Sequence, residues 1–208
     1  QNDWRARDIR VGMDGTHFTV ESPNAEFRGE FQMGLLGRHQ VGNALLALAV
    51  AAELGASPEQ VRAGFARATP PKMRLQLGTV RGIHVLNDAY NANADSMRAA
   101  LETLRDLPVA GRRVAVLGDM AELGEQSGPA HAEIAQRPLL CIAALLLAQH
   151  HAGIAVEAGE AADDGKVVRE MAVAMQFDEI GEDLVDVVEC VRALGMARDL
   201  GDLPRGEV

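Results

Sequence analysis

The chain has 208 residues, 48% of them hydrophobic, so it is long enough to bury the core of one large domain or of one domain and part of another. Its formal net charge of −10 argues against a nucleic-acid-binding surface, because no basic stripe is available to neutralise phosphates. A nucleotide stays compatible with this charge, since a few local donors are enough to hold one.

Cysteine usage and hydropathy predict a cytoplasmic protein. Cys141 and Cys190 lie far apart with no CxxC pattern, which suits a reducing compartment and predicts neither a disulfide framework nor a zinc site. The longest apolar run, residues 139–148, is too short to span a bilayer, and no targeting segment is found. Because Gln1 is not an initiator methionine, we expect a piece of a longer, soluble protein.

The first 36 residues have the pattern of β structure. Ile9–Val11 and His17–Val20 alternate between apolar and polar residues, and Asp14-Gly15 between them is typical of a hairpin turn. A further strand is expected over residues 25–33. This part of the chain therefore predicts a small antiparallel sheet.

Residues 44–55 predict a helix that is apolar on nearly every side and ends at Gly55, a residue type common just after helix C-termini. We expect this helix to be buried, with its amino-terminal end in the interior or in a cleft. Unpaired backbone N–H groups at such an end favour an anion or phosphate. His39 and Asn43 lie there, and Asn43 is equally consistent with a helix cap and with a ligand contact.

A second helix and a break in the chain follow. Ser57 to Gln60 reads S-P-E-Q, which is a clear helix start and predicts a helix to about Arg67. The prolines of T-P-P-K then interrupt the chain, and we place a domain boundary between Pro70 and Gly82. The predicted domains are residues 1–78 and 79–208.

A polar bend beyond this boundary is the strongest candidate for a ligand site. A strand pattern over 82–86 is followed by N-D-A-Y-N-A-N-A-D and then by an amphipathic helix from Met97. Either Asp95 or Ser96 is able to cap that helix. In α/β sheets, loops at the carboxyl ends of strands bind ligands, which makes this bend a candidate ligand site. The alternative is a polar strand-to-helix loop without a ligand. Four polar side chains of the bend are left without a local structural role: Asp88, Tyr90, Asn91 and Asn93.

Strand and helix patterns alternate through the rest of the chain. An apolar strand over 112–117 leads into Gly118-Asp119, and a helix is expected over 129–136. The alternation predicts an α/β fold with an open, mostly parallel sheet and helices on both faces. Further strand and helix signals lie at 139–148, 153–156, 165–175, 184–188 and 191–194. Four histidines are expected to be structural or solvated: His84, His131, His150 and His151.

Two motifs together resemble the Mur ligase family. The first is N-D-A-Y-N-A-N-A-D-S-M at residues 87–97, and the second is L-G-D-M-A-E-L-G at residues 117–124. In addition, G-R-H-Q-V-G-N-A at residues 37–44 is similar to the family's G-x-H-N-x-x-N-A segment. Arg74 falls where the family has an R-[LMF] pair before an interdomain linker. The resemblance is tight over residues 35–131 and loose before them.

The resemblance implies a Rossmann-like C-terminal domain preceded by the end of an ATP-binding α/β central domain. It also implies an ATP-dependent, Mg²⁺-requiring enzyme of peptidoglycan precursor synthesis, a monomer, which joins D-Ala-D-Ala to UDP-MurNAc-tripeptide through an acyl phosphate. The nucleotide would then be contacted by His39, Asn43, Arg74, Asp88, Tyr90 and Asn91. The incoming substrate side would be lined by Asn93, Asp95, Ser96, Asp119, Met120 and Glu122.

Three departures from the family pattern matter. The Walker-type G-x-x-G-K-[ST] loop occurs nowhere in this sequence, so we expect these residues alone to be inactive. Gln40 stands where the family usually has Asn, and V-V-E-C-V-R at 187–192 replaces a segment that ends in K-G-S-R. Two alternatives therefore stay open: a non-catalytic nucleotide- or peptide-binding module, and a ligase of the folylpolyglutamate synthase type.

Overall fold

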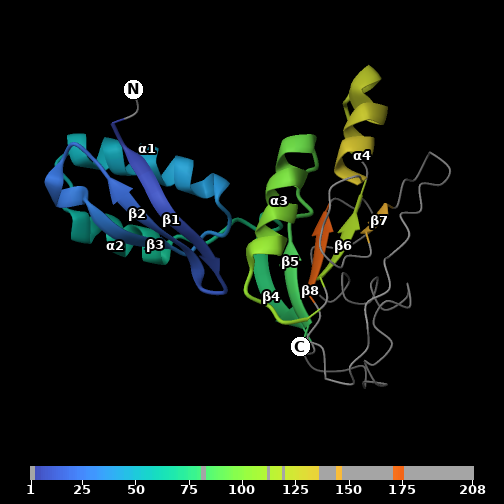
Figure 1. Cartoon of the computed structure of the whole chain (residues 1–208), viewed down its shortest axis with the longest axis horizontal. Helices are drawn as coiled ribbons and strands as arrows, with labels where there is room; N and C mark the ends of the chain where they lie inside the picture. Colours follow the sequence, from blue (N-terminus) through green and yellow to red (C-terminus); the bar gives the residue numbers. More distant parts are fainter. Residues whose placement is uncertain are drawn as a thin grey trace.

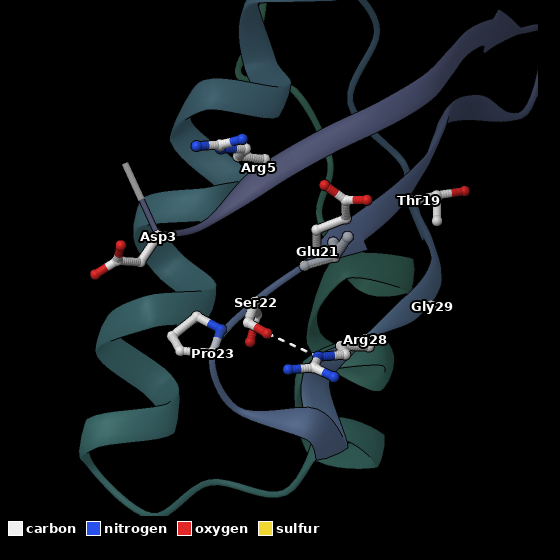
Figure 2. A pocket seen from close by; sticks show the side chains of 9 residues that line it. Asp3, Arg5, Thr19, Glu21, Ser22, Pro23, Arg28 and Gly29 are labelled. Atoms are coloured by element: carbon white, nitrogen blue, oxygen red, sulfur yellow. Dashed lines mark hydrogen bonds between the residues drawn. The ribbon is translucent and has the colours of Figure 1, made fainter. Parts of the chain in front are cut away.

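The computed structural model describes residues 3–80, 83–111, 113–118, 120–135, 144–146 and 171–175. Within these residues the chain forms an α/β fold with two sheets, each with its own helices (Figure 1). None of the helices in the described ranges is long and apolar enough to cross a membrane.

The first sheet is antiparallel, with strands in the order β1-β2-β3. These strands are β1 (Arg5–Gly12), β2 (Gly15–Glu21) and β3 (Gly29–Met33). Gly12 pairs with Gly15, so the predicted Asp-Gly hairpin is confirmed, with Met13 and Asp14 at its turn. The third strand is shorter than the predicted 25–33, because Ala25–Phe27 forms a 3₁₀ turn (η1) capped by the Asn24 side chain.

Two helices, α1 (His39–Glu53) and α2 (Pro58–Arg67), cover the apolar face of this sheet. Alternation along the strands sends every second side chain to that face, which is why a continuous core forms from such short strands. Aromatic rings give it much of its volume, and the Phe31 ring packs against Phe65 of α2 at 6.3 Å between centroids. The buried members are Phe18, Val20, Phe27, Phe31, Met33, Val41, Ala44 and Leu48.

The prediction that the first helix is buried on all sides is wrong. It begins at His39 rather than at residue 44, and Val41, Ala44 and Leu48 do face the core. However, Leu46, Val50 and Leu54 are 69%, 58% and 81% exposed. Their spacing of four residues places them on one side of the helix, and the three-stranded sheet covers only the other side.

The start of α2 was predicted correctly, and its capping box offers a direct stability test. Ser57 Oγ accepts from the Gln60 N–H at 3.3 Å, while Gln60 Oε1 accepts from the Ser57 N–H at 2.8 Å. We expect Ser57→Ala to lower the free energy of unfolding by about 1 kcal/mol, because it removes the acceptor for one otherwise unpaired helix N–H. Urea denaturation measures this, with the exposed Thr69→Ala as control. A loss below about 0.3 kcal/mol would contradict the assignment.

The second sheet has the order β4-β5-β8-β6-β7. The β4 and β5 strands are antiparallel, and the other pairs are parallel, as predicted for a mostly parallel sheet. The predicted elements at 153–156, 184–188 and 191–194 lie outside the described residues. The strands are β4 (Gln76–Val80), β5 (Ile83–Asn87), β6 (Arg113–Leu117), β7 (Ala144–Leu146) and β8 (Met171–Met175). The helical elements are α3 (Ala94–Asp106), the 3₁₀ turn η2 (Gly124–Gln126) and α4 (Ser127–Ala135).

Helix α3 lies between its own sheet and the first unit (Figure 1). Its apolar side supplies Met97, Leu101 and Leu104 to the second core, where all three are almost completely buried. Val11 and Leu36 from the first unit belong to the same core, so the two units share an apolar contact. Arg38 adds an ion pair to Asp106 at the end of α3, with Nε and Oδ2 2.6 Å apart. The division into domains 1–78 and 79–208 stays a prediction.

Candidate functional site

The loops that follow β5 and β6 leave the second sheet at the same edge. Both strands run parallel to β8, and Asn87 and Val116 are both paired with Ala174. Because hydrogen-bonded strands lie about 4.8 Å apart, the two loops begin about 10 Å from each other. The carboxyl edge of a parallel sheet is where ligands bind in α/β proteins. The polar bend at residues 88–93 and the loop at residues 118–123 are therefore placed to face a common ligand region.

The bend holds the linker between the two units in a fixed conformation. Asp88 Oδ1 accepts from the Leu75 N–H at 3.0 Å, and the Tyr90 N–H donates to the Met73 carbonyl at 3.1 Å. Met73 and Leu75 have φ angles of +59° and +47°, a region that costs non-glycine residues energy. These two hydrogen bonds explain how the linker keeps that conformation.

Arg74 lies between these two linker residues, and its guanidinium carbon lies 4.1 Å from the centroid of the Tyr90 ring. Both side chains are exposed, so the cation and the ring present one continuous surface to solvent. The structure thus brings together three of the predicted nucleotide residues: Arg74, Asp88 and Tyr90. Asn91, also exposed, follows directly.

Asp88 is a partly buried carboxyl whose ionised form is destabilised by its surroundings. Burial raises its pKa to about 6, against the opposing effects of the hydrogen bond from Leu75 and of the nearby Arg74 cation. Its second oxygen, Oδ2, has no hydrogen bond to any described residue. At neutral pH the group is therefore mainly a carboxylate with one oxygen available to accept hydrogen bonds from a ligand. Perturbed carboxyl groups of this kind are common at functional sites.

The structure of the bend differs from two of the predictions. Asn93, not Asp95 or Ser96, caps α3: its Oδ1 accepts from the Ser96 N–H at 2.9 Å, and Ser96 Oγ accepts from the Asn93 N–H at 3.0 Å. The prediction that Asn93 has no local structural role is therefore wrong, and Asp88 has a structural role at a distance, through its hydrogen bond to Leu75. Asp95 instead forms an ion pair with Arg98, at 2.6 Å between Oδ1 and the guanidinium.

The predicted residues at the start of α1 lie apart from the bend. Gly37, with φ +106°, approaches α3 so closely that a Cβ there would lie 2.8 Å from Thr103 Oγ1. Thr103 is ten residues from the Asn93 cap, which is about 15 Å along the helix axis. Asn43 donates to Gln40 Oε1 at 3.0 Å instead of capping α1. No hydrogen bond or ion pair among the described residues joins His39 or Asn43 to the bend.

The loop after β6 is anchored by His131, which was predicted to be structural or solvated. The Met120 N–H donates to His131 Nε2 at 3.0 Å, and His131 Nδ1 lies 2.7 Å from the Ser127 carbonyl, to which it donates. The helix begins at Ser127, two residues before the predicted start, which places His131 in its second turn. Because helical side chains point back toward the N-terminus, a histidine there is a recognisable partner for the preceding loop.

The predicted substrate residues of this loop differ in what they expose. The Met120 side chain is only 3% exposed and belongs to the second core, so it contributes packing rather than an open surface. Glu122 is exposed. Asp119 lies outside the described residues.

The described residues hold no group of three or more His, Cys, Asp or Glu side chains able to bind a metal ion. Mg²⁺ is usually bound through one or two carboxylates together with substrate phosphates and waters, rather than by an all-protein cage. Asp88 and Glu122, on separate loops, are carboxylates of the described site that could contribute to such binding only together with a bound nucleotide.

Comparisons with known proteins agree with the two motifs. Residues 73–203 match the family model described as "Mur ligase, glutamate ligase domain". The chain is 38% identical over 133 residues to UDP-N-acetylmuramoyl-tripeptide–D-alanyl-D-alanine ligase of Bacillus subtilis, covering 64% of this chain and 28% of that protein. It is 39% identical over 193 residues to the enzyme of the same name from Mycobacterium tuberculosis, covering 76% of this chain and 38% of that protein.

A solved structure shares the fold. The MurF ligase from Thermotoga maritima, determined in complex with ADP, matches with a TM-score of 0.67 at 17% identity, covering 95% of this chain and 48% of that one. The chain therefore spans about 28–38% of the length of the two curated relatives and about half of this structure. The family match extends over more than half of the sequence, and the chain belongs to the Mur ligase family.

Proposed function

We propose that this chain is part of an ATP-dependent ligase that joins D-Ala-D-Ala to UDP-MurNAc-tripeptide in the cytoplasm. The proposal is supported by relatives that carry this activity in their names and are 38–39% identical to the chain. The observation that carries it furthest is the grouping of Arg74, Asp88 and Tyr90 at the carboxyl edge of the second sheet. A cation, a carboxylate with an available oxygen and an aromatic ring are the groups that bind phosphate, sugar hydroxyls and a base.

The reaction makes an amide from a carboxylate, which is a poor acyl donor. The carboxylate oxygen attacks the γ-phosphorus of ATP, giving an acyl phosphate and ADP. The amine of the dipeptide then attacks the acyl carbon, phosphate leaves, and the amine nitrogen loses a proton. Catalysis of such steps depends on positioning and on neutralising phosphate charge. Mg²⁺ supplies part of that neutralisation when bound, and we assign it mainly to parts of the enzyme outside this sequence.

In this proposal the residues of the chain hold the nucleotide and the acceptor. Asp88 Oδ2 accepts hydrogen bonds from the ribose hydroxyls, while Tyr90 and Asn91 lie beside the nucleotide. Arg74 approaches the phosphates, and leaves the Tyr90 ring to do so. His39 and Asn43 reach the adenine only if the two units move relative to each other. Asn93, Asp95 and Ser96 continue toward the acceptor, with Glu122 on the opposite loop.

A non-catalytic binding module is the second candidate. It is favoured by Gln40 and by the altered segment at 187–192, which lies outside the described residues. A folylpolyglutamate-type ligase would instead take glutamate as the acceptor.

The test is ADP release by the natural full-length protein supplied with ATP, Mg²⁺ and UDP-MurNAc-tripeptide. We expect release to depend on D-Ala-D-Ala and not on L-glutamate. Release with glutamate would support the folate-type ligase. Calorimetric binding of ADP or of D-Ala-D-Ala without any turnover would support the binding module and contradict the ligase.

A further inference from the structure

His131 uses one ring nitrogen to hold the loop after β6 and the other to bind the first turn of its own helix, α4. Nε2 accepts from the Met120 N–H, and Nδ1 donates to the Ser127 carbonyl, with the Ser127 hydroxyl a further 3.4 Å contact. These partners require the neutral tautomer that carries its proton on Nδ1. The imidazole thus links the amino-terminal turn of α4 to the backbone of the loop, eleven residues earlier in the chain.

The loop from Met120 to Leu123 has an unfavourable backbone conformation that other contacts must stabilise. Glu122 has φ +62°, which is unfavourable for a residue with a side chain, and costs about 1 kcal/mol or more. On one side of it, Met120 is held by the buried side chain and the His131 hydrogen bond. On the other side, Leu123 packs against the second core and its carbonyl accepts from the Gln126 N–H at 3.0 Å. Between the two anchors, Glu122 is the charged side chain presented to solvent.

The loop is also in the right place to meet a second substrate. It leaves the same edge of the sheet as the bend that carries Asp88, two strand positions away. If the nucleotide lies against the bend, the acyl phosphate forms at the end of the triphosphate, and the amine that attacks its acyl carbon approaches from this neighbouring loop.

We propose that His131 is a positioning residue for the amine acceptor: it fixes the Met120–Leu123 loop so that Glu122 faces the incoming dipeptide. This inference rests on the proposed function for the identity of the acceptor. It rests on the structure alone for the anchoring of the loop. His131 acts through Met120 and touches neither substrate.

The anchor is tested by two substitutions in the full-length protein. His131→Gln keeps an acceptor oxygen near the position of Nε2, whereas His131→Leu fills a similar volume without an acceptor. Hydrogen exchange of the peptide that contains Met120 should become at least about tenfold faster in His131→Leu and stay near wild type in His131→Gln. Equal exchange in all three proteins would overturn the anchoring role, whatever the enzyme's substrate.

The link to the acceptor is tested by steady-state kinetics of the same three proteins. We expect His131→Leu to lower kcat/KM for D-Ala-D-Ala by about 10–100-fold, because a displaced loop misplaces the acceptor. KM for ATP should change less than about twofold, and His131→Gln should restore most of the loss. If His131 were only a general structural residue, His131→Leu would change KM for both ATP and D-Ala-D-Ala and would lower the melting temperature, and His131→Gln would not restore activity. That result would overturn the proposal. A wild-type enzyme that never responds to the dipeptide would overturn the proposed function and the acceptor assignment, while the exchange result still decides the anchor.

Discussion

Leu104→Ala is expected to lower the free energy of unfolding by about 2–5 kcal/mol, the largest effect of any single substitution considered for this chain. Leu104 is completely buried on α3, within the core that also contains Val11 and Leu36 from the first unit. Removal of its side chain loses the transfer free energy of the buried carbons and leaves a cavity that two packed layers are unable to close.

Urea denaturation followed by circular dichroism measures the loss. Leu46→Ala is the matched control, since Leu46 is also a helical leucine but is 69% exposed, and we expect it to change stability by less than about 0.5 kcal/mol. A loss below about 1 kcal/mol for Leu104→Ala would show that the core shared by the two units contributes little.

Asp88→Asn is expected to stabilise the protein at neutral pH and to lose this advantage in acid. Burial raises the pKa of Asp88 to about 6, so between pH 4 and 6 the folded chain binds a proton that the unfolded chain releases. The contribution of this proton to stability is complete below about pH 4 and is lost as the pH rises through about 6. The difference from the ordinary value of 3.8 corresponds to at most about 3 kcal/mol, and we expect about 1–3 kcal/mol for a carboxyl that keeps some contact with water.

The asparagine keeps an oxygen that accepts from the Leu75 N–H, so the linker contact survives the substitution. Melting temperatures of Asp88→Asn and wild type, compared at pH 4.5 and pH 7.5, test the sign. The exposed Asp3→Asn serves as control. If Asp88→Asn were less stable than wild type at pH 7.5, the carboxylate would be stabilising the fold. Its presence would then be explained by stability, and the argument that it serves to bind a ligand would fail.

Local signals were enough to predict much of the fold. The hairpin of β1 and β2, the Ser57 cap and the end of α2 before Pro70 each depend on neighbouring residues, and the structure confirms them. The prediction that α1 is buried on all sides failed, because an apolar helix surface shows only that this surface can be covered by other parts of the protein. Which side is covered depends on the sheet it meets.

The candidate site was harder to predict, because its contacts join residues that are distant in sequence. The Asp88 bend was found from its polar residues, but its hydrogen bond to Leu75 crosses 13 positions and the His131 contact to Met120 crosses 11. The sequence offers no period or spacing that encodes such pairs. Asp95 or Ser96 was predicted to cap α3, and Asn93 was overlooked although Asn is an equally good cap residue type. The extended backbone of Asn93, φ −142° and ψ 166°, makes it the cap.

The affinity of the full-length protein for ADP, measured by calorimetry at pH 7.5 for wild type and Asp88→Ala, tests the central claim most directly. A hydrogen bond from a ribose hydroxyl to a carboxylate contributes about 1.5–3 kcal/mol, so we predict a Kd that rises by about 10–150-fold. The exposed Glu26→Ala should leave the Kd unchanged. An Asp88→Ala protein that folds and binds ADP as tightly as wild type would contradict the account, because the bend would then hold the linker and no nucleotide.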